Sequence, residues 1–372
     1  MSKKYNTLIT AIFCGFLGVV LAASVIVPDK EFSELENRNL SKAPKLTLEN
    51  LKDGSFMQDA EDYTADHILG RDFWVALKAW CEKLSGKQEN NGVYFGQEQT
   101  LINHMDTPDM DKALQNVGHI NKLVENVDVP VYFGLIPSAA QVWKDRLPDG
   151  APTADESSLI DVLYANSQAT NLEMESALNA HKNEDIYYRT DHHWTSLGAG
   201  YGANVLLEAM GLESLDLNSY EKVTVSDQFY GTIFSSSGVR WVLPDAIDIY
   251  IPEEGVTVTS NFTGKEEPGE MYVEEYLEKK DKYSYFMGGN QPLCVLEKEN
   301  SDGPRVLVIR DSYSDAMAPF LTQRCSQVHL FDLRYNLTSI QQYVAEHEID
   351  HVVVLYSFSN FNQGTNLFAL GR

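Results

Sequence analysis

The sequence predicts an α/β fold: a parallel sheet with flanking helices and an antiparallel β insertion, preceded by a transmembrane helix. Three observations support this prediction. An apolar run without charged residues occupies residues 8–27. From residue 306 to residue 356, short β-branched runs alternate with helix-like segments, as expected for parallel strands joined by helical crossovers. Between about residues 220 and 300, β-branched and aromatic residues alternate with polar ones and glycines, which is typical of antiparallel strands.

Composition narrows the functional class. The chain has 372 residues, 43% of them hydrophobic, which is enough for a substantial core. Its net charge of −25 disfavours binding to nucleic acid. Cys14 lies in the apolar run, so only Cys81, Cys294 and Cys325 remain, an odd number that argues against a complete disulfide framework. No cysteine or histidine pair has zinc-ligand spacing, and we expect no metal and no cofactor.

Residues 1–27 are predicted to be a transmembrane anchor or signal segment. About 20 apolar residues suffice to cross a hydrocarbon core of roughly 30 Å. Lys3 and Lys4 precede the run and acidic residues follow it, so the positive-inside rule places the C-terminal part outside the cytoplasm. Small residues at positions 22–24 would permit cleavage, but the length of the run favours an uncleaved anchor. We therefore expect a single-pass protein of the cell membrane.

The remainder divides into a linker and lead-in at residues 28–50 and one α/β domain at residues 51–372, with the insertion at about 220–300. Residues 56–84 have helical spacing, and their apolar stripe is predicted to face the core. The stripe consists of Phe73, Leu77, Trp80 and Leu84.

Further helices and strands follow from hydrophobic periodicity. The expected helices are 111–127, 153–180, 196–210, 314–324 and 339–347. The expected strands are 131–136, 186–188, 306–309, 328–333 and 352–356. Gly198, Gly200 and Gly202 do not match a dinucleotide-binding pattern, and we expect them to allow close packing of their helix instead.

Two separated segments carry residues suited to acyl chemistry. Asp191, His192 and His193 follow the expected strand 186–188, and Ser312 stands where the expected strand 306–309 turns into a helix. A serine hydroxyl becomes a nucleophile when an imidazole takes its proton, and a carboxylate orients that imidazole. Ligands of open α/β sheets bind beyond the carboxyl ends of the strands, which would let residues some 120 positions apart meet.

Other uses of these residues remain open. The Asp-Ser pair alone is often only a helix cap. Adjacent histidines of an extended segment point in opposite directions, so a two-histidine metal site would need further ligands that the sequence does not identify. If Ser312 is a nucleophile, the free N–H groups at the start of its helix would suit the oxyanion of a tetrahedral intermediate. Residues 229–232 and 235–238 of the insertion could supply a pocket wall or an oxyanion donor, although their glycines and serines favour ordinary turns.

Asp191-His192-His193-Trp194 and Asp311-Ser312-Tyr313 together resemble the DHHW-motif proteins, relatives of the alginate O-acetyltransferases in the SGNH-hydrolase-like group. The resemblance extends through Glu36-Asn37-Arg38, residues 63–67 and residues 91–96 to the C-terminal strands. It implies an SGNH-hydrolase-like fold with Ser312 as nucleophile, His193 rather than His192 as base, and Asp191 as the group that orients it.

Four neighbours of these residues are expected to contact the substrate: His192, Trp194, Arg310 and Tyr313. Arg310 departs from the small residue that many relatives have before the aspartate.

The resemblance implies an extracytoplasmic O-acetyltransferase that modifies a cell-surface polysaccharide or exopolysaccharide. By analogy, a membrane-bound O-acyltransferase partner would supply the acetyl group, because acetyl-coenzyme A is not expected outside the cell. Two alternatives use the same features: a carbohydrate acetylesterase in which water replaces the sugar, and a non-catalytic glycan-binding envelope protein.

Overall fold

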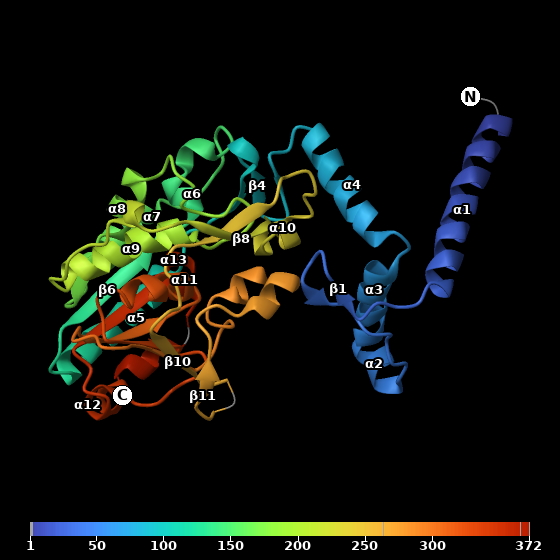
Figure 1. Cartoon of the computed structure of the whole chain (residues 1–372). Helices are drawn as coiled ribbons and strands as arrows, with labels where there is room; N and C mark the ends of the chain where they lie inside the picture. The colour runs from blue at the N-terminus through green and yellow to red at the C-terminus, as the bar shows by residue number, and fades with distance from the viewer. Residues whose placement is uncertain (1–2, 263, 365, 372) are drawn as a thin grey trace. The chain divides into compact units, whose positions relative to one another are not determined.

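The computed structural model describes residues 3–262, 264–364 and 366–371 (Figure 1). The chain forms two compact units. The smaller comprises Met1–Asn91 with Phe234–Trp241, and the larger comprises Gly92–Ile233 with Val242–Arg372.

The smaller unit is mainly helical. Its elements are α1 (Lys3–Ile26), β1 (Phe32–Ser33), β2 (Arg38–Asn39), α2 (Leu48–Asp53), α3 (Ser55–His67), α4 (Arg71–Leu84) and β3 (Glu89–Asn90). Within the described residues, α1 is the one helix with the length and composition of a membrane span: its most apolar window has a mean hydropathy of 2.5 and none of that window is buried. The helix is consistent with a single-pass membrane anchor.

The predicted helix 56–84 is wrong in its continuity and in its buried face. It is broken between α3 and α4, because Gly70 has a φ of 71° and begins a new helix. The α4 helix buries Ala79, whereas the stripe that was expected in the core is exposed. The exposed fractions are 61% for Phe73, 38% for Leu77, 42% for Trp80 and 80% for Leu84.

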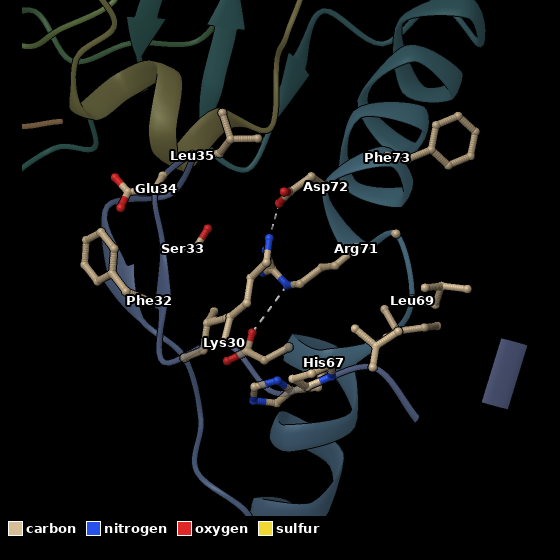
Figure 2. Close-up of a pocket in the computed structure, with 16 residues that line it drawn as sticks. Lys30, Phe32, Ser33, Glu34, Leu35, His67, Leu69, Arg71, Asp72 and Phe73 are labelled. Carbon is tan, nitrogen blue, oxygen red and sulfur yellow. Dashed lines mark ion pairs between the residues drawn. The ribbon is translucent and has the colours of Figure 1, made fainter. Parts of the chain in front are cut away.

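Ion pairs connect the lead-in segment to the end of α3 and to the start of α4. Arg71 donates through both terminal nitrogens to Glu36, at 2.6 and 2.9 Å, and Arg38 donates to Asp66. The hydrogen bond from Arg38 is the main reason that the pKa of Asp66 lies well below its usual range. Asp66 and Arg71 also line a cavity of about 410 Å³, and Figure 2 shows the Arg71 guanidinium among the lining residues.

An eight-stranded mixed sheet organises the larger unit, with the order β11-β10-β12-β14-β13-β15-β6-β7. Strands β14, β13, β15, β6 and β7 are parallel, and β12 pairs antiparallel with β14. Their bounds are β6 (Val131–Ile136), β7 (Thr170–Leu172), β10 (Val256–Ser260), β11 (Glu267–Gly269), β12 (Leu293–Lys298), β13 (Arg305–Arg310), β14 (Gln327–Phe331) and β15 (His351–Ser357). The mixed α/β architecture is therefore confirmed.

Side chains alternate between the two faces along each strand, so both faces of this sheet carry apolar side chains. Helices cover both faces. On one face, Val306 and Val308 pack with α8 (Met174–Ala180), α9 (Ser196–Ala209) and α11 (Tyr313–Leu321). On the other, Leu307 and Ile309 pack in a second core. That core includes residues of α5 (Met110–Asn126), α7 (Glu156–Ala165), α12 (Ile340–Glu346), α13 (Phe358–Gln363) and the 3₁₀ helix η6 (Asn366–Gly371).

Smaller elements complete this unit. They are β4 (Val93–Phe95), β5 (Leu101–Asn103), α6 (Ala139–Val142), β8 (Val223–Phe229), α10 (Thr232–Ser237), which crosses into the smaller unit, β9 (Asp245–Ile249), and the 3₁₀ helices η1 (Gln97–Gln99), η2 (Lys144–Arg146), η3 (Leu217–Ser219), η4 (Glu274–Glu278) and η5 (Lys282–Tyr285).

Three sequence predictions differ from the structure. The expected helix 153–180 is two helices, α7 and α8, with strand β7 between them. The expected strand 186–188 forms only an isolated bridge between Tyr187 and Trp194. The β-rich insertion divides: β8 and β9 form their own antiparallel pair, while β10, β11 and β12 extend the main sheet. Periodicity within a segment does not reveal which sheet accepts a strand.

Glycines of α9 allow this helix to lie directly on the loop that carries Asp191 to His193. A Cβ atom at Gly198 would lie 2.2 Å from the carbonyl oxygen of Ile186, and one at Gly202 would lie 2.7 Å from two ring atoms of Trp194. Contacts this short do not occur, so only glycine fits. The expected close packing of this helix is confirmed.

We expect Gly198→Ala to lower the free energy of unfolding by about 1–3 kcal/mol, because the added methyl group must displace the Ile186 backbone. The measurement is urea unfolding of the full chain in detergent, followed by tryptophan fluorescence. Gly118→Ala in α5 is the control: a Cβ atom there meets nothing within 4 Å, and the lower backbone entropy of alanine should stabilise the helix by roughly 0.5–1 kcal/mol. Equal effects of the two substitutions would contradict the packing argument.

Candidate active site

Ser312 stands in the turn between β13 and α11, and Asp311 fixes that turn. The Oδ2 atom of Asp311 accepts hydrogen bonds from the N–H and hydroxyl of Ser357, at 2.9 and 2.7 Å, and from Nδ2 of Asn360 at 2.8 Å. Its Oδ1 atom accepts from the N–H of Tyr313 at 3.1 Å. The aspartate of the Asp-Ser-Tyr motif therefore ties the turn to the end of β15 and the start of α13.

Asp245 of β9 holds the second segment. Its carboxylate accepts from the N–H groups of Arg189 and Thr190, at 3.0 and 2.9 Å, and from the Thr190 hydroxyl at 2.5 Å. Burial raises the pKa of Asp245, whereas these hydrogen bonds lower it. The insertion thus supplies an anchor for the loop that follows Tyr188.

Two hydrogen bonds join the segments, which are about 120 residues apart in sequence. Nε1 of Trp194 donates to the Tyr313 carbonyl oxygen at 2.8 Å, and the Tyr313 hydroxyl donates to the His192 carbonyl oxygen. Trp194 and Tyr313 are both buried. They therefore hold the histidine loop against the start of α11.

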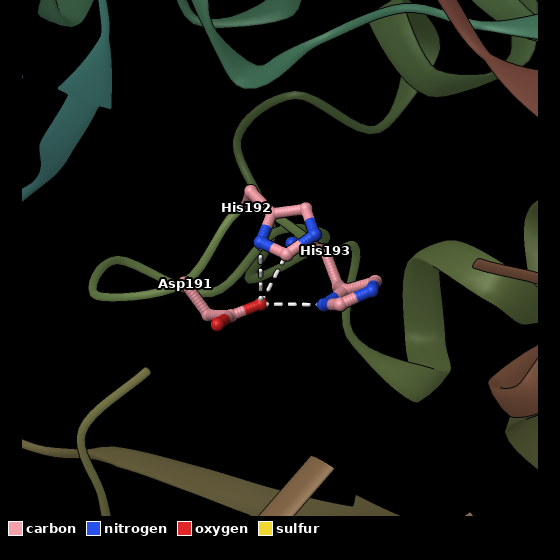
Figure 3. Close-up of side chains that lie close together, drawn as sticks. All are labelled: Asp191, His192 and His193. Carbon is pink, nitrogen blue, oxygen red and sulfur yellow. Dashed lines mark hydrogen bonds and ion pairs between the residues drawn. The ribbon is translucent and has the colours of Figure 1, made fainter. Parts of the chain in front are cut away.

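Asp191, His193 and Ser312 form a continuous hydrogen-bonded chain. Nδ1 of His193 lies 2.6 Å from Oδ1 of Asp191, and Nε2 of His193 lies 2.7 Å from the Ser312 Oγ. Figure 3 shows the carboxylate pointing at both imidazoles. Because a carboxylate can only accept, Nδ1 carries a proton and Nε2 is left to accept the hydroxyl proton of Ser312. This is the arrangement that activates a serine.

The Asp191 carboxylate is buried but fully hydrogen-bonded. Oδ2 accepts from the N–H and hydroxyl of Thr232, at 2.7 and 2.9 Å, and Oδ1 also accepts from the His193 N–H at 3.0 Å. Burial alone would raise the pKa of Asp191, but the two histidines and these donors hold it well below its usual range. A Cβ atom at Gly231 would lie 2.2 Å from that of Asp191, so glycine lets the Thr232 turn approach.

The sequence did not indicate that Tyr283 is part of the candidate site. Its ring stacks on the imidazole of His193, with centroids 3.7 Å apart and planes at 9°, and its hydroxyl donates to the Ser312 carbonyl oxygen at 3.2 Å. The His192 ring also contacts this imidazole, with centroids 3.8 Å apart. Tyr283 belongs to η5, and the aromatic run Tyr283-Ser284-Tyr285-Phe286 was the only sequence signal that could have pointed to it.

His192 lies differently from His193. Its Nδ1 atom is 2.6 Å from the Thr232 hydroxyl, and 36% of its side chain is exposed. Burial, followed by the nearby His193, lowers the pKa of His192 to about 4, so this ring is neutral at pH 7. Among the four residues expected to contact substrate, His192 is the one with substantial exposed surface.

Arg310 lies in the interior behind the Ser312 turn, with no exposed surface. Its guanidinium pairs with Asp315, at 2.9 Å between Nη2 and Oδ1 and 3.1 Å between Nη1 and Oδ2. The burial of Arg310, Trp194 and Tyr313 favours a supporting role for each over the expected substrate contact. An interior ion pair of this kind rigidifies the turn from below.

The helix-start N–H groups are already engaged within the turn. Those of Ser314 and Asp315 donate to the Asp311 and Ser312 carbonyl oxygens, both at 3.2 Å, and that of Tyr313 donates to the Asp311 side chain. The expectation that these groups are free for an oxyanion is therefore wrong, because the turn closes on itself.

Asp191, His192 and His193 could also be considered as metal ligands, since one atom of each lies within 4.8 Å of the others. A cation would have to bind lone pairs of the Asp191 carboxylate. Those oxygens already accept hydrogen bonds from His193 and Thr232. The geometry fits proton transfer better than metal binding.

The family model for the DHHW protein matches residues 129–331. A probable alginate O-acetylase AlgJ of Pseudomonas syringae pv. tomato is 24% identical over 221 residues, which cover 55% of this chain and 52% of the relative. The matched regions cover 52% of this relative and 34% of a second probable alginate O-acetylase AlgJ, from Pseudomonas putida, so the chain spans about half or less of the length of these curated relatives.

Solved structures share the fold. A DHHW family protein from Eubacterium siraeum has a TM-score of 0.66 and 24% identity, covering 76% of this chain and 95% of that one. Bacillus cereus PatB1, solved with a sulfonyl adduct, has a TM-score of 0.63 and 22% identity, covering 74% and 97%.

We expect Asp191→Asn to reduce stability in a pH-dependent way. The pKa of Asp191 is lower in the folded chain than its unfolded value of about 3.9, so the carboxylate stabilises the fold above about pH 4 and this contribution is lost as the pH falls further. The difference in free energy of unfolding between wild type and variant should therefore shrink from pH 6 towards about pH 3.

The measurement is urea unfolding at several pH values. Asp227→Asn changes an exposed carboxylate of β8 and serves as the control, with a curve expected to follow the wild type. A difference for Asp191→Asn that is constant across this pH range would contradict the assignment.

Proposed function

The chain belongs to the DHHW protein family, and from that premise we propose that it is an extracytoplasmic O-acetyltransferase that modifies a polysaccharide through Ser312, His193 and Asp191. The observation that carries the proposal is the chain of two hydrogen bonds, 2.6 and 2.7 Å long, that runs from Asp191 through His193 to the Ser312 hydroxyl. Both His193 and Asp191 are buried, so water competes little for these bonds.

Two similarities support the reaction class. The relative from Pseudomonas syringae is named as a probable alginate O-acetylase, and PatB1 has been solved with a sulfonyl adduct. Sulfonyl groups are also useful probes here, because they react with activated hydroxyls such as the proposed Ser312 nucleophile.

In the first half-reaction, the Ser312 Oγ attacks the carbonyl carbon of an acetyl donor while its proton passes to Nε2 of His193. The tetrahedral intermediate collapses as the bond to the donor oxygen breaks, and the imidazolium returns the proton to that leaving group. The Asp191 carboxylate stabilises the imidazolium and holds it in the correct tautomer. The product is an acetyl ester on Ser312.

In the second half-reaction, a sugar hydroxyl gives its proton to Nε2 of His193 and attacks the acetyl carbon. The bond to the Ser312 Oγ breaks, and the proton passes to that oxygen. The acetyl group ends on the sugar and the enzyme is restored. If water takes the place of the sugar, the same steps hydrolyse the ester, so the reaction class depends on what occupies the acceptor site.

The net charge of the chain indicates the kind of glycan acceptor, and its membrane orientation indicates the source of the acetyl group. With a net charge of −25, the chain should favour a neutral glycan over a strongly anionic one. If α1 spans the membrane with the larger unit outside, a membrane-bound O-acyltransferase partner would supply the acetyl group at the outer surface.

We expect Ser312→Ala to reduce acetyl transfer at least about 10³-fold, because among the described residues Ser312 supplies the hydroxyl that is hydrogen-bonded to Nε2 of His193. The full chain in detergent is incubated with p-nitrophenyl acetate and a panel of neutral and uronic-acid oligosaccharides, and acetylated sugars are counted by mass spectrometry. Faster p-nitrophenol release with acceptor indicates transfer, whereas an unchanged rate without sugar acetylation indicates hydrolysis.

Ser314→Ala is the matched control. This buried serine lies two residues away, and its hydroxyl has no hydrogen-bond partner in the described part of the chain, so its loss should leave the rate within about threefold. A sulfonyl fluoride should label the wild type and Ser314→Ala but not Ser312→Ala. Equal rates or equal labelling in all three proteins would exclude Ser312 as the nucleophile.

Tyr283 is proposed as a positioning residue for the His193 ring. Tyr283→Phe retains the stacked ring and loses only the bond to the Ser312 carbonyl, so we expect kcat within about fivefold of wild type. Tyr283→Leu removes the stack and should lower kcat at least about 30-fold with little change in KM, because the imidazole can then rotate. Equal losses in both variants, or a loss confined to KM, would contradict this role.

A further inference from the structure

Helix α4 has two apolar faces, although one suffices to pack it. The inner face buries Ala79, and Val75 packs so closely on Gly238 that a Cβ atom there would lie 3.0 Å from the valine Cγ1. On the outer face, the stripe of Phe73, Leu77, Trp80 and Leu84 is exposed. At 100° per residue, these four side chains fall within an arc of about 60°.

An exposed stripe of this size requires an apolar cover. Single exposed apolar residues are ordinary, but two aromatic and two leucine side chains in one row are typical of a binding surface. The stripe runs along three turns of a helix about 21 Å long. A surface that long and narrow suits a helix lying in a lipid interface.

The stripe is next to the segment that has the composition of a membrane span. Phe16 of α1 contacts Trp74 of α4 edge-on, with ring centroids 6.2 Å apart, and the Ser24 hydroxyl accepts a hydrogen bond from the Leu69 N–H at 2.8 Å. The α1 helix exposes apolar side chains along its length. Trp74 also contacts Phe73 of the stripe edge-on, with ring centroids 5.2 Å apart, so the stripe adjoins the apolar surface of α1.

These contacts show where α4 begins along α1. Ser24 lies near the C-terminal end of α1 and Phe16 near its middle, so α4 begins beside the half of the span that is away from Lys3 and Lys4. An apolar hollow of about 810 Å³ lies between this half of α1 and α3, lined by side chains of both helices. Lipid chains around α1 would reach this hollow as well as the stripe.

The polar margin of the stripe has the residue types found at membrane interfaces. Trp80 contacts Trp241 with centroids 4.5 Å apart, and the Lys83 ammonium lies 4.7 Å above the Trp241 ring. Tryptophan and lysine are favoured where apolar chains meet the headgroups, because each combines an apolar body with a polar tip.

From this arrangement we propose that α4 lies in the membrane interface beside α1, with its outer face buried in the lipid of the outer leaflet. The occupant of the face is the lipid bilayer itself. The smaller unit then contacts the membrane through two elements rather than through a single span with a free linker. This inference concerns the smaller unit and does not depend on the proposed chemistry of Ser312.

The test uses the full chain reconstituted in phosphatidylcholine and phosphatidylglycerol liposomes. Single cysteines are introduced in a Cys14→Ser, Cys81→Ser background and carry a fluorophore. Leu77→Cys and Leu84→Cys report on the outer face, and Lys78→Cys, about 100° from Leu77 on the same helix, is the matched control. With nitroxide-labelled lipids in the bilayer, quenching at the two leucine positions should be at least about threefold that at Lys78.

Equal quenching at the three positions, whether from exposure to water or from cover by protein, would overturn the proposal. A second measurement avoids introduced cysteines: brominated lipids should quench the tryptophan fluorescence of the wild type more than that of Trp80→Phe. Quenching that is unchanged by Trp80→Phe would also count against membrane contact.

Discussion

The hydrogen bond between His193 and Asp191 is the contact that the candidate site depends on. It determines which imidazole nitrogen carries a proton, and so leaves Nε2 to accept the proton of Ser312 at 2.7 Å. A buried carboxylate is unfavourable unless its oxygens are saturated, and Thr232 supplies two of the donors. The insertion is therefore part of the site: it provides the donors that keep Asp191 charged, the Asp245 anchor of the loop, and the ring that stacks on His193.

Precise positioning explains why so many large side chains around the site are buried. Trp194 and Tyr313 are linked by a hydrogen bond across the two segments, and Arg310 pairs with Asp315 beneath the turn. None of these groups needs to touch a substrate to matter, because an error of about 1 Å between base and nucleophile is costly in catalysis. The buried residues next to the two motifs are therefore better explained as structural support for the site than as a substrate-binding surface.

The sequence allowed the parallel strands and the meeting of Asp191, His193 and Ser312 to be predicted, because each depends on local pattern or on a motif. Strands β6, β13, β14 and β15 match the predicted apolar runs to within a few residues. Tyr283 could not be identified, since its role arises from a stacking contact with a residue 90 positions away, and aromatic residues are common in β-rich segments. The stripe of α4 was assigned to the core for a related reason: periodicity shows that a helix has an apolar face, but not what covers it.

What covers an apolar face is also the open question for the smaller unit, which contains α1 and α4. In a soluble protein, an amphipathic helix turns its apolar stripe inward, because water is the only alternative. Beside a membrane span, lipid is a second apolar medium, and a helix can use both of its faces. The α4 helix buries Ala79 against its own unit and exposes large residues, including Phe73 and Trp80. Small inner residues allow close approach to the protein, whereas large outer ones suit a fluid partner that adapts to their shape. The same residues that contradict a core assignment are therefore those that a membrane-facing helix requires.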